Sequence, residues 1–110
     1  MIRQDFEGII ARESILTTYI QDIVGLTWDD SRDGVVLKET DELLEWDEYQ
    51  YVEIHPVEVE DDRIDGVIFF GDGTIEFRYE KSREAINFTH HSFEIIDKVI
   101  ASLAQNLIVY

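Results

Sequence analysis

The two ends of the chain carry apolar residues at spacings of three and four, a pattern that predicts an amphipathic helix at each end. The first helix is expected from Asp5 to Val24, with Gly25 after it as a left-handed C-cap. Its apolar stripe consists of Phe6, Ile9, Ile10, Leu16, Tyr19, Ile20, Ile23 and Val24. A later start at Ser14, after a short strand, is the alternative, because Gly8 weakens the first half.

The second helix is expected to follow Ser92, which is a suitable N-cap, and Glu94 lies in its first turn. Its apolar stripe consists of Phe93, Ile96, Val99, Ile100, Leu103 and Leu107. A striped helix must bury its apolar side against another layer, so the segment between the helices is expected to supply a sheet.

Alternating apolar and polar residues predict a strand over 51–62. Val52 and Ile54 are the apolar positions in its first part, whereas Val57 and Val59 take that role further on. This change of phase falls at Pro56, which cannot donate a ladder hydrogen bond. We therefore expect a bulge or an edge strand at this proline.

The segment 65–80 predicts a hairpin, because Asp72-Gly73 suits a two-residue type I′ turn between two apolar runs. This turn pairs Gly71 with Thr74, Phe70 with Ile75 and Ile68 with Phe77. The core face of the hairpin is then expected to consist of Ile68, Phe70, Ile75 and Phe77. Val67 and Phe69 fall on the other face, beside Glu76 and Arg78, which makes the first strand an interior one.

The remaining elements are short. Asp33-Gly34 predicts a turn before a strand at 35–39, residues 40–46 predict one helical turn capped by Thr40, and residues 85–88 predict another short strand. The expected fold is a single α+β domain over residues 1–110. It has an N-terminal helix, an antiparallel sheet of about four strands with the Asp72-Gly73 hairpin, and a C-terminal helix, with both helices on one sheet face.

Charge changes this picture of an ordinary small domain. The chain has 25 acidic and 9 basic residues, a net charge of −16, and no cysteine. Such a chain repels phosphates and anionic lipids, so we expect no direct nucleic-acid or membrane partner. The N-terminus lacks the pattern of a signal peptide, and no apolar run reaches the roughly 18 residues of a membrane span, so we expect a cytoplasmic protein.

Catalytic and metal-binding motifs are not apparent. The segment 61–72 resembles a calcium loop, but Arg63 occupies the position of the third ligand and the flanking residues predict strands. His90, His91 and Glu94 are a weak metal candidate, because adjacent histidines point in different directions. No serine lies in a Gly-x-Ser-x-Gly elbow. We expect neither catalysis nor a cofactor or metal.

The acidity is concentrated in one segment, 39–62, which holds eleven Asp and Glu residues and no Lys or Arg. Aromatic residues stand among these acids, a combination typical of contact surfaces. Trp46 has an alternative place in the core. The candidate partner-binding residues are Asp41, Glu42, Glu45, Trp46, Asp47, Glu48, Tyr49, Tyr51, Glu53, Glu58 and Glu60.

A basic protein is the partner that such a surface would capture by long-range attraction. In size, acidity and lack of a catalytic motif, the chain resembles bacterial immunity proteins in general type, with no family motif matched residue by residue. We predict a non-catalytic inhibitor, of the immunity-protein or antitoxin type, that occludes a basic nuclease-like toxin. The alternatives are a nucleic-acid mimic that blocks a host DNA- or RNA-binding machine, and an accessory domain whose acidity serves only solubility.

Overall fold

The computed structural model describes residues 5–106 as two helices and six strands with one short 3-10 helix. The elements are α1 (Asp5–Val24), β1 (Leu26–Asp29), β2 (Gly34–Leu37), β3 (Tyr49–Val59), β4 (Asp62–Phe70), β5 (Ile75–Tyr79), β6 (Ala85–Asn87), η1 (Phe88–His90) and α2 (Phe93–Gln105). One antiparallel sheet has the order β3-β4-β5-β6, and β1 and β2 form a separate antiparallel hairpin. The expected α+β class is confirmed.

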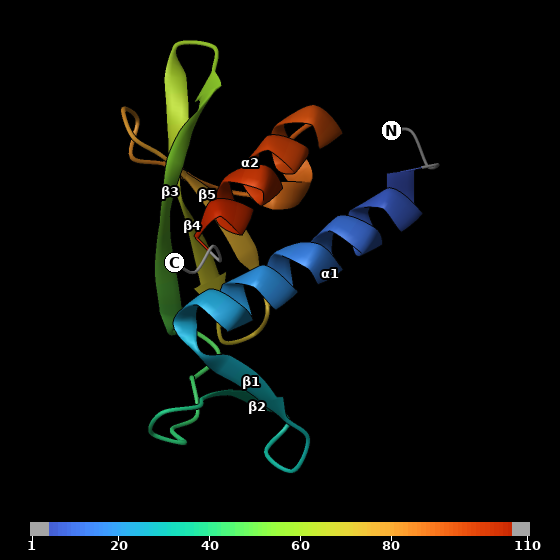
Figure 1. Ribbon diagram of the computed structural model, residues 1–110, viewed down its shortest axis with the longest axis vertical. Coiled ribbons are helices and arrows are strands. Elements are labelled where there is room, and N and C mark those ends of the chain that lie inside the picture. Colours follow the sequence, from blue (N-terminus) through green and yellow to red (C-terminus); the bar gives the residue numbers. More distant parts are fainter. Residues whose placement is uncertain (1–4, 107–110) are drawn as a thin grey trace.

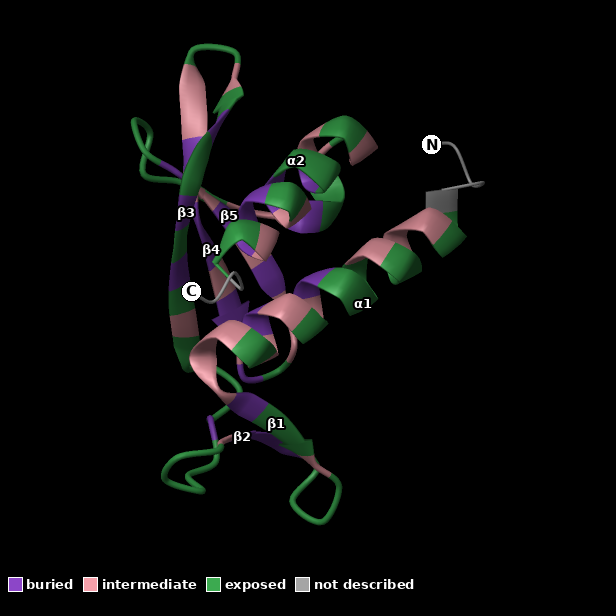
Figure 2. Cartoon of the chain, viewed as in Figure 1, coloured by how far each residue is buried: buried purple, intermediate pink, exposed green. Residues whose placement is uncertain are grey.

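Both helices lie on the same side of the four-stranded sheet (Figure 1), as expected from their apolar stripes. They bury most of these stripes against the inward residues of the strands (Figure 2). Phe6 and Ile10, which were expected in the buried stripe of α1, are instead 70% and 49% exposed, because the N-terminal half of this helix extends away from the sheet (Figure 1). The fully buried members of this core include Leu16, Ile20, Ile64, Val67, Phe77, Ile96, Val99 and Leu103. The face of the sheet that points away from the helices is therefore left without a covering layer in the part of the chain that the structure describes.

The helix ends agree with the sequence signals. α1 begins at Asp5, so the alternative start at Ser14 is wrong, and Gly25 after it has a φ of +71° in the left-handed region. At the start of α2, the hydroxyl of Ser92 accepts a hydrogen bond from the Ile95 N–H at 3.3 Å. Leu107, the last residue of the expected second stripe, lies outside the described residues.

β3 contains the change of phase that the sequence predicts. Val52, Ile54 and Val57 are all buried, and the pairing register with β4 shifts between Glu53 and Val57, which places an irregularity at Pro56. β3 is also an edge strand of the sheet. Both expectations for this proline are thus confirmed, because an edge position and a bulge each tolerate its missing N–H.

The loop between β4 and β5 has three residues, 71–73, so the expected two-residue turn is wrong. The Phe70 N–H donates to the Thr74 carbonyl oxygen, and the Gly73 N–H donates to the Phe70 carbonyl oxygen, each at 2.9 Å. Gly73 has a φ of +91°, the left-handed conformation that three-residue hairpin loops place at this position.

One additional loop residue moves every pair of this hairpin by one position and reverses the faces of β4. The observed partners are Val67–Phe77, Ile68–Glu76 and Phe69–Ile75. The buried apolar residues next to the turn are Val67, Phe69, Ile75 and Phe77. Ile68 and Phe70, expected in the core, lie instead on the opposite face and are only partly buried. The interior position of β4 is confirmed.

Residues 40–46 form no helical turn, contrary to expectation, because they pair with β2. Leu43 forms an antiparallel bridge with Val36, and the Leu44 N–H donates to the Val35 carbonyl oxygen at 2.8 Å. The side chain of Leu44 is buried in this arrangement. Pairing and burial therefore override the local capping signal, which fixes only one turn.

Candidate functional site

The surface that the helices leave free is the strongest candidate site. We call it the open face, and it consists of Tyr49, Tyr51, Glu53, Ile68, Phe70, Glu76 and Arg78. These residues come from the three adjacent strands β3, β4 and β5 and alternate with buried residues, so they share the side of the sheet opposite the helices. An uncovered sheet face would ordinarily be polar, whereas the centre of this one is aromatic and aliphatic.

The aromatic centre is built from cross-strand neighbours. Tyr49 pairs with Phe70, and their rings meet edge to face with centroids 5.7 Å apart. Tyr51 pairs with Ile68 on the same face. Tyr49 is 58% exposed, so a large part of its ring contacts solvent. Aromatic rings that remain exposed on a rigid sheet are well suited to anchor a protein partner.

Tyr51 lies across the sheet over Gly66 of β4. A Cβ atom on Gly66 would overlap the Tyr51 ring, so the glycine is what allows this close approach. The Tyr51 hydroxyl is 3.4 Å from the Asp65 carbonyl oxygen, to which it donates. Desolvation and the nearby charge of Asp65 raise the pKa of Tyr51, which keeps its hydroxyl protonated as a donor.

Arg78 adds a cation to the same cluster. Its guanidinium carbon lies 5.6 Å from the centroid of the Tyr51 ring, and its Nε is 3.9 Å from an Asp65 carboxylate oxygen. Asp65 reaches this position because it is the additional residue where the β4–β5 register shifts between Ile64 and Gly66.

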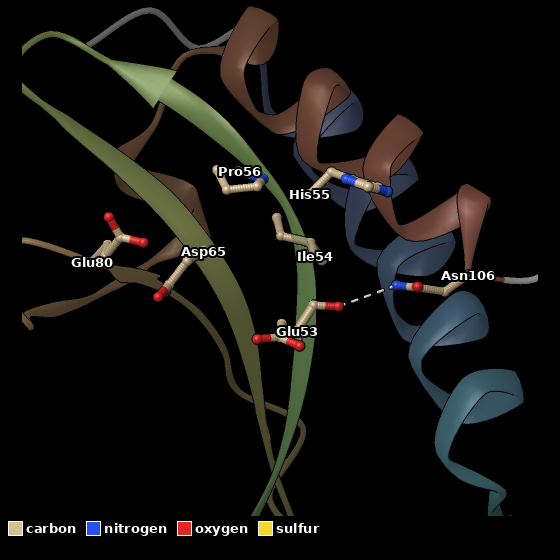
Figure 3. A pocket seen from close by; sticks show the side chains of 7 residues that line it. All are labelled: Glu53, Ile54, His55, Pro56, Asp65, Glu80 and Asn106. Atoms are coloured by element: carbon tan, nitrogen blue, oxygen red, sulfur yellow. Dashed lines mark hydrogen bonds between the residues drawn. The ribbon is translucent and has the colours of Figure 1, made fainter.

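An open recess of about 390 Å³ lies at the bulges of β3 and β4, where Glu53 and Asp65 are among its lining residues. Figure 3 shows the carboxylates of Glu53, Asp65 and Glu80 on one side of β3, with His55 and Asn106 on the other. Arg63 partly neutralises this group, since its Nε is 3.2 Å from a Glu80 carboxylate oxygen. The open face therefore joins aromatic rings to carboxylates within one continuous surface.

The acidic turn, residues 45–48, precedes β3 and is hydrogen-bonded to the other end of this surface. The Gly71 N–H donates to the Glu48 carbonyl oxygen at 2.9 Å, and the Glu45 N–H donates to the Glu48 carboxylate at 2.8 Å. Trp46, between them, is 71% exposed, so its alternative place in the core is wrong. The turn carries Trp46 and Asp47 at its tip, where both are accessible.

The other predicted acids lie farther apart. Asp41 accepts from Arg32 near the β1–β2 hairpin, and its neighbour Glu42 is also exposed there. Glu58 and Glu60 are exposed at the opposite end of β3, which at about 3.3 Å per residue is roughly 35 Å long. The eleven predicted residues are all exposed, but they follow the length of β3 and the loop before it instead of forming one compact cluster.

Sequence reasoning missed the parts of the open face that come from β4 and β5. A two-residue turn places Ile68 and Phe70 in the core, and no local signal marks the bulge between Ile64 and Gly66 that brings Asp65 beside Tyr51. A Gly-Asp-Gly loop also fits a three-residue hairpin with its second glycine in the left-handed region, and that reading would have placed both apolar residues outside.

Side chains of α2 protect the free backbone edge of β3. The Ser102 hydroxyl donates to the His55 carbonyl oxygen at 2.9 Å, and the Asn106 amide donates to the Glu53 carbonyl oxygen at 3.2 Å. Pro56 further prevents strand addition at this edge. The side chains of the open face are therefore more accessible for binding than the backbone at this edge of the sheet.

The histidine candidate is structural. His91 lies between the Tyr79 hydroxyl, 2.8 Å from its Nε2, and the Phe88 carbonyl oxygen, 3.3 Å from its Nδ1. Burial lowers the pKa of His91. Over residues 5–106, no group of three or more His, Asp or Glu side chains has the geometry of a metal site. Nor does any helix in that range have the length and apolar character needed to cross a membrane.

Comparisons with protein-family models, with curated proteins and with solved structures find no match to this chain.

Proposed function

We propose that this protein is a non-catalytic inhibitor, of the immunity-protein or antitoxin type, that binds a basic nuclease-like toxin through the open face and the adjoining acidic turn. Aromatic side chains in the centre of the face supply the binding energy. The carboxylates around them stand in place of the phosphates of a nucleic-acid substrate and pair with Arg and Lys of the toxin.

The single observation that carries this proposal is the exposure of Tyr49 and Tyr51 on a sheet face that no described helix covers (Figure 1), together with that of Trp46 on the adjoining acidic turn. Solubility alone would be served by charged residues on this face, and it gives no reason for exposed aromatic rings. A net charge of −16 adds long-range attraction for a cationic partner, which speeds association at low salt.

The aromatic centre of the open face favours a toxin inhibitor over the alternative function, a mimic of duplex DNA. A mimic would be expected to place carboxylates in two rows at phosphate-like separations, with charge across the whole surface. Here the middle of the face is occupied by Tyr49, Tyr51, Ile68 and Phe70.

Two sources of partner are to be tested, the proteins that co-purify with this protein from its own cells and the product of the reading frame immediately upstream. Each is assayed for nuclease activity with and without one equivalent of the inhibitor, and for association kinetics. A five-site variant neutralises Glu45, Glu48, Glu53, Glu58 and Glu60 as glutamines. The variant is expected to fold at least as stably as the parent, because like-charge repulsion falls, and to associate at least about tenfold more slowly at low salt.

The matched control neutralises five exposed acids elsewhere, so that the net charge changes equally. The control changes Glu7, Glu13, Glu84 and Glu94 to glutamine and Asp22 to asparagine. An unchanged association rate and salt dependence in the five-site variant would leave solubility as the purpose of the acidity.

A further inference from the structure

The ring of Tyr51 is held as a platform on the open face. It lies over Gly66, its hydroxyl donates to the Asp65 carbonyl oxygen at 3.4 Å, and 37% of the residue remains exposed. Because the ring is fixed before binding, a partner group that stacks on it loses little free energy to ordering of the tyrosine.

The chain's own Arg78 shows which chemistry this platform accommodates. Its guanidinium lies over the Tyr51 ring at 5.6 Å and beside Asp65 at 3.9 Å. Both distances are near the outer limits of a cation–π contact and of an ion pair. Arg78 therefore leaves part of the ring and of the Asp65 carboxylate accessible, since the side chain of Arg78 is 37% exposed and that of Asp65 is 19% exposed.

From this arrangement we infer that the open face recognises an arginine of the basic partner, whose guanidinium stacks on Tyr51 and pairs with the carboxylates of Asp65 and Glu53. The inference rests on the proposed function and names the partner group that the face selects. Arginine is favoured over lysine because its planar guanidinium stacks on an aromatic ring and binds carboxylates in a fork, whereas an ammonium is a compact and strongly hydrated charge.

Two synthetic peptides of equal length and charge, one alternating Gly and Arg and the other alternating Gly and Lys, test this selection. Their affinities are measured by calorimetry at low ionic strength with the full chain. The arginine peptide is expected to bind about threefold to fivefold more tightly than the lysine peptide.

Substitutions of Tyr51 separate stacking from general attraction. Tyr51→Leu is expected to abolish the preference for arginine while leaving lysine-peptide binding within about twofold, and Tyr51→Phe, which retains the ring, is expected to keep the preference. Trp28→Leu, which removes an aromatic ring that is 51% exposed on the separate β1–β2 hairpin, is the matched control and is expected to retain the preference too.

Arg78→Gln provides a second test, because it removes the internal guanidinium that occupies part of the platform. It is expected to increase the affinity for the arginine peptide about twofold to fourfold more than Lys98→Gln does, although both variants lose one positive charge. Lys98 is exposed on α2, on the helix side of the sheet.

Equal affinity for the two peptides, or a preference that survives Tyr51→Leu, would overturn the selection of arginine. Failure of both peptides to bind would overturn it as well. The proposed function is decided separately by the five-site carboxylate variant and the protein partner, so either conclusion can fail without the other.

Discussion

The two faces of the four-stranded sheet differ in what their apolar residues do. On the helix side, Val67 and Phe77 are completely buried beneath α1 and α2. On the open face, Tyr49 remains more than half exposed although it lies on the same sheet. Apolar area stabilises a fold only where it is removed from water, so the aromatic residues of the open face contribute little to folding. The apolar area that these residues still expose can be removed from water when a partner binds.

The carboxylates also fall into two groups, those that are bound by donors within the fold and those that are not. Where a carboxylate serves the fold, it is held by specific donors, as Asp62 is by the N–H groups of Arg63, Lys81 and Ser82 at 2.7, 2.8 and 3.0 Å. Glu58, by contrast, is largely exposed, and its nearest cation, Arg63, is at 3.9 Å. Glu58 is thus only weakly paired within the chain, which suits it to the cationic partner proposed above.

The largest expected effect is a difference in the free energy of unfolding between variants on the two faces of the sheet. Phe77→Ala should lower the free energy of unfolding by about 3–5 kcal/mol, because it leaves a cavity beneath the helices. Tyr49→Ala should lower it by no more than about 1 kcal/mol, since most of its ring already contacts water. Urea denaturation measures both values, and similar losses for the two variants would contradict the division of roles between the faces.

Gly71→Ala tests how the acidic turn is attached to the sheet. A Cβ atom at this position would overlap the Glu45 carbonyl oxygen, which is backbone and cannot rotate away. We expect the free energy of unfolding to fall by about 2 kcal/mol and the turn that carries Trp46 to be displaced. Denaturation measures the first effect, and a change in tryptophan fluorescence reports the second. Gly73→Asn is the control, because no atom lies near that Cβ and asparagine tolerates a positive φ. Equal losses in the two variants would show that the contact with Glu45 is unimportant.

Ser102→Ala tests whether α2 stabilises the β3 edge of the sheet. The substitution leaves the His55 carbonyl oxygen without its donor, and a loss of about 1 kcal/mol is expected from the unpaired, partly buried acceptor. Gln105→Ala, at an exposed position of the same helix, should change stability by less than about 0.5 kcal/mol. Amide exchange along β3 would report whether the edge opens, and an unchanged exchange rate would argue that this hydrogen bond does not protect it.

The smallest effect concerns pH. Desolvation opposes ionisation of Asp62, but the N–H donors of Lys81, Arg63 and Ser82 hold its pKa at about 2. A pKa that is lower in the folded state contributes stability above the unfolded value of 3.8, and this contribution is lost as the pH falls through 2. The difference in stability between the parent and Asp62→Asn should therefore be constant above about pH 4.5 and should diminish towards pH 2.

Asp61→Asn, at the exposed neighbouring position, controls for the loss of one negative charge. Denaturation curves at a series of pH values between 2 and 7 provide the comparison. A difference for Asp62→Asn that does not change over this range would mean that the backbone donors do not stabilise the ionised carboxylate.

Local signals determined most of the elements. The span of α1 from Asp5 to Val24, the Ser92 cap of α2, and the change of phase at Pro56 each depend on residues close together in the chain, and the structure has all three where expected. The concentration of acids before β4 and their exposure also follow from composition and alternation, since charged side chains remain in water wherever the fold places them.

Only the tertiary structure decided which apolar residues lie on the open face. A loop of three residues instead of two exchanges the faces of β4, because strand side chains alternate with a period of two, and this moves Ile68 and Phe70 from the core to the open face. Backbone pairing with β2 likewise overrode the helical signal at residues 40–46. The pairing with β2 depends on a contact between separate segments, about which local periodicity carries no information. The face of β4 depends on the length of one short loop, and the alternation of apolar residues does not distinguish a two-residue loop from a three-residue one.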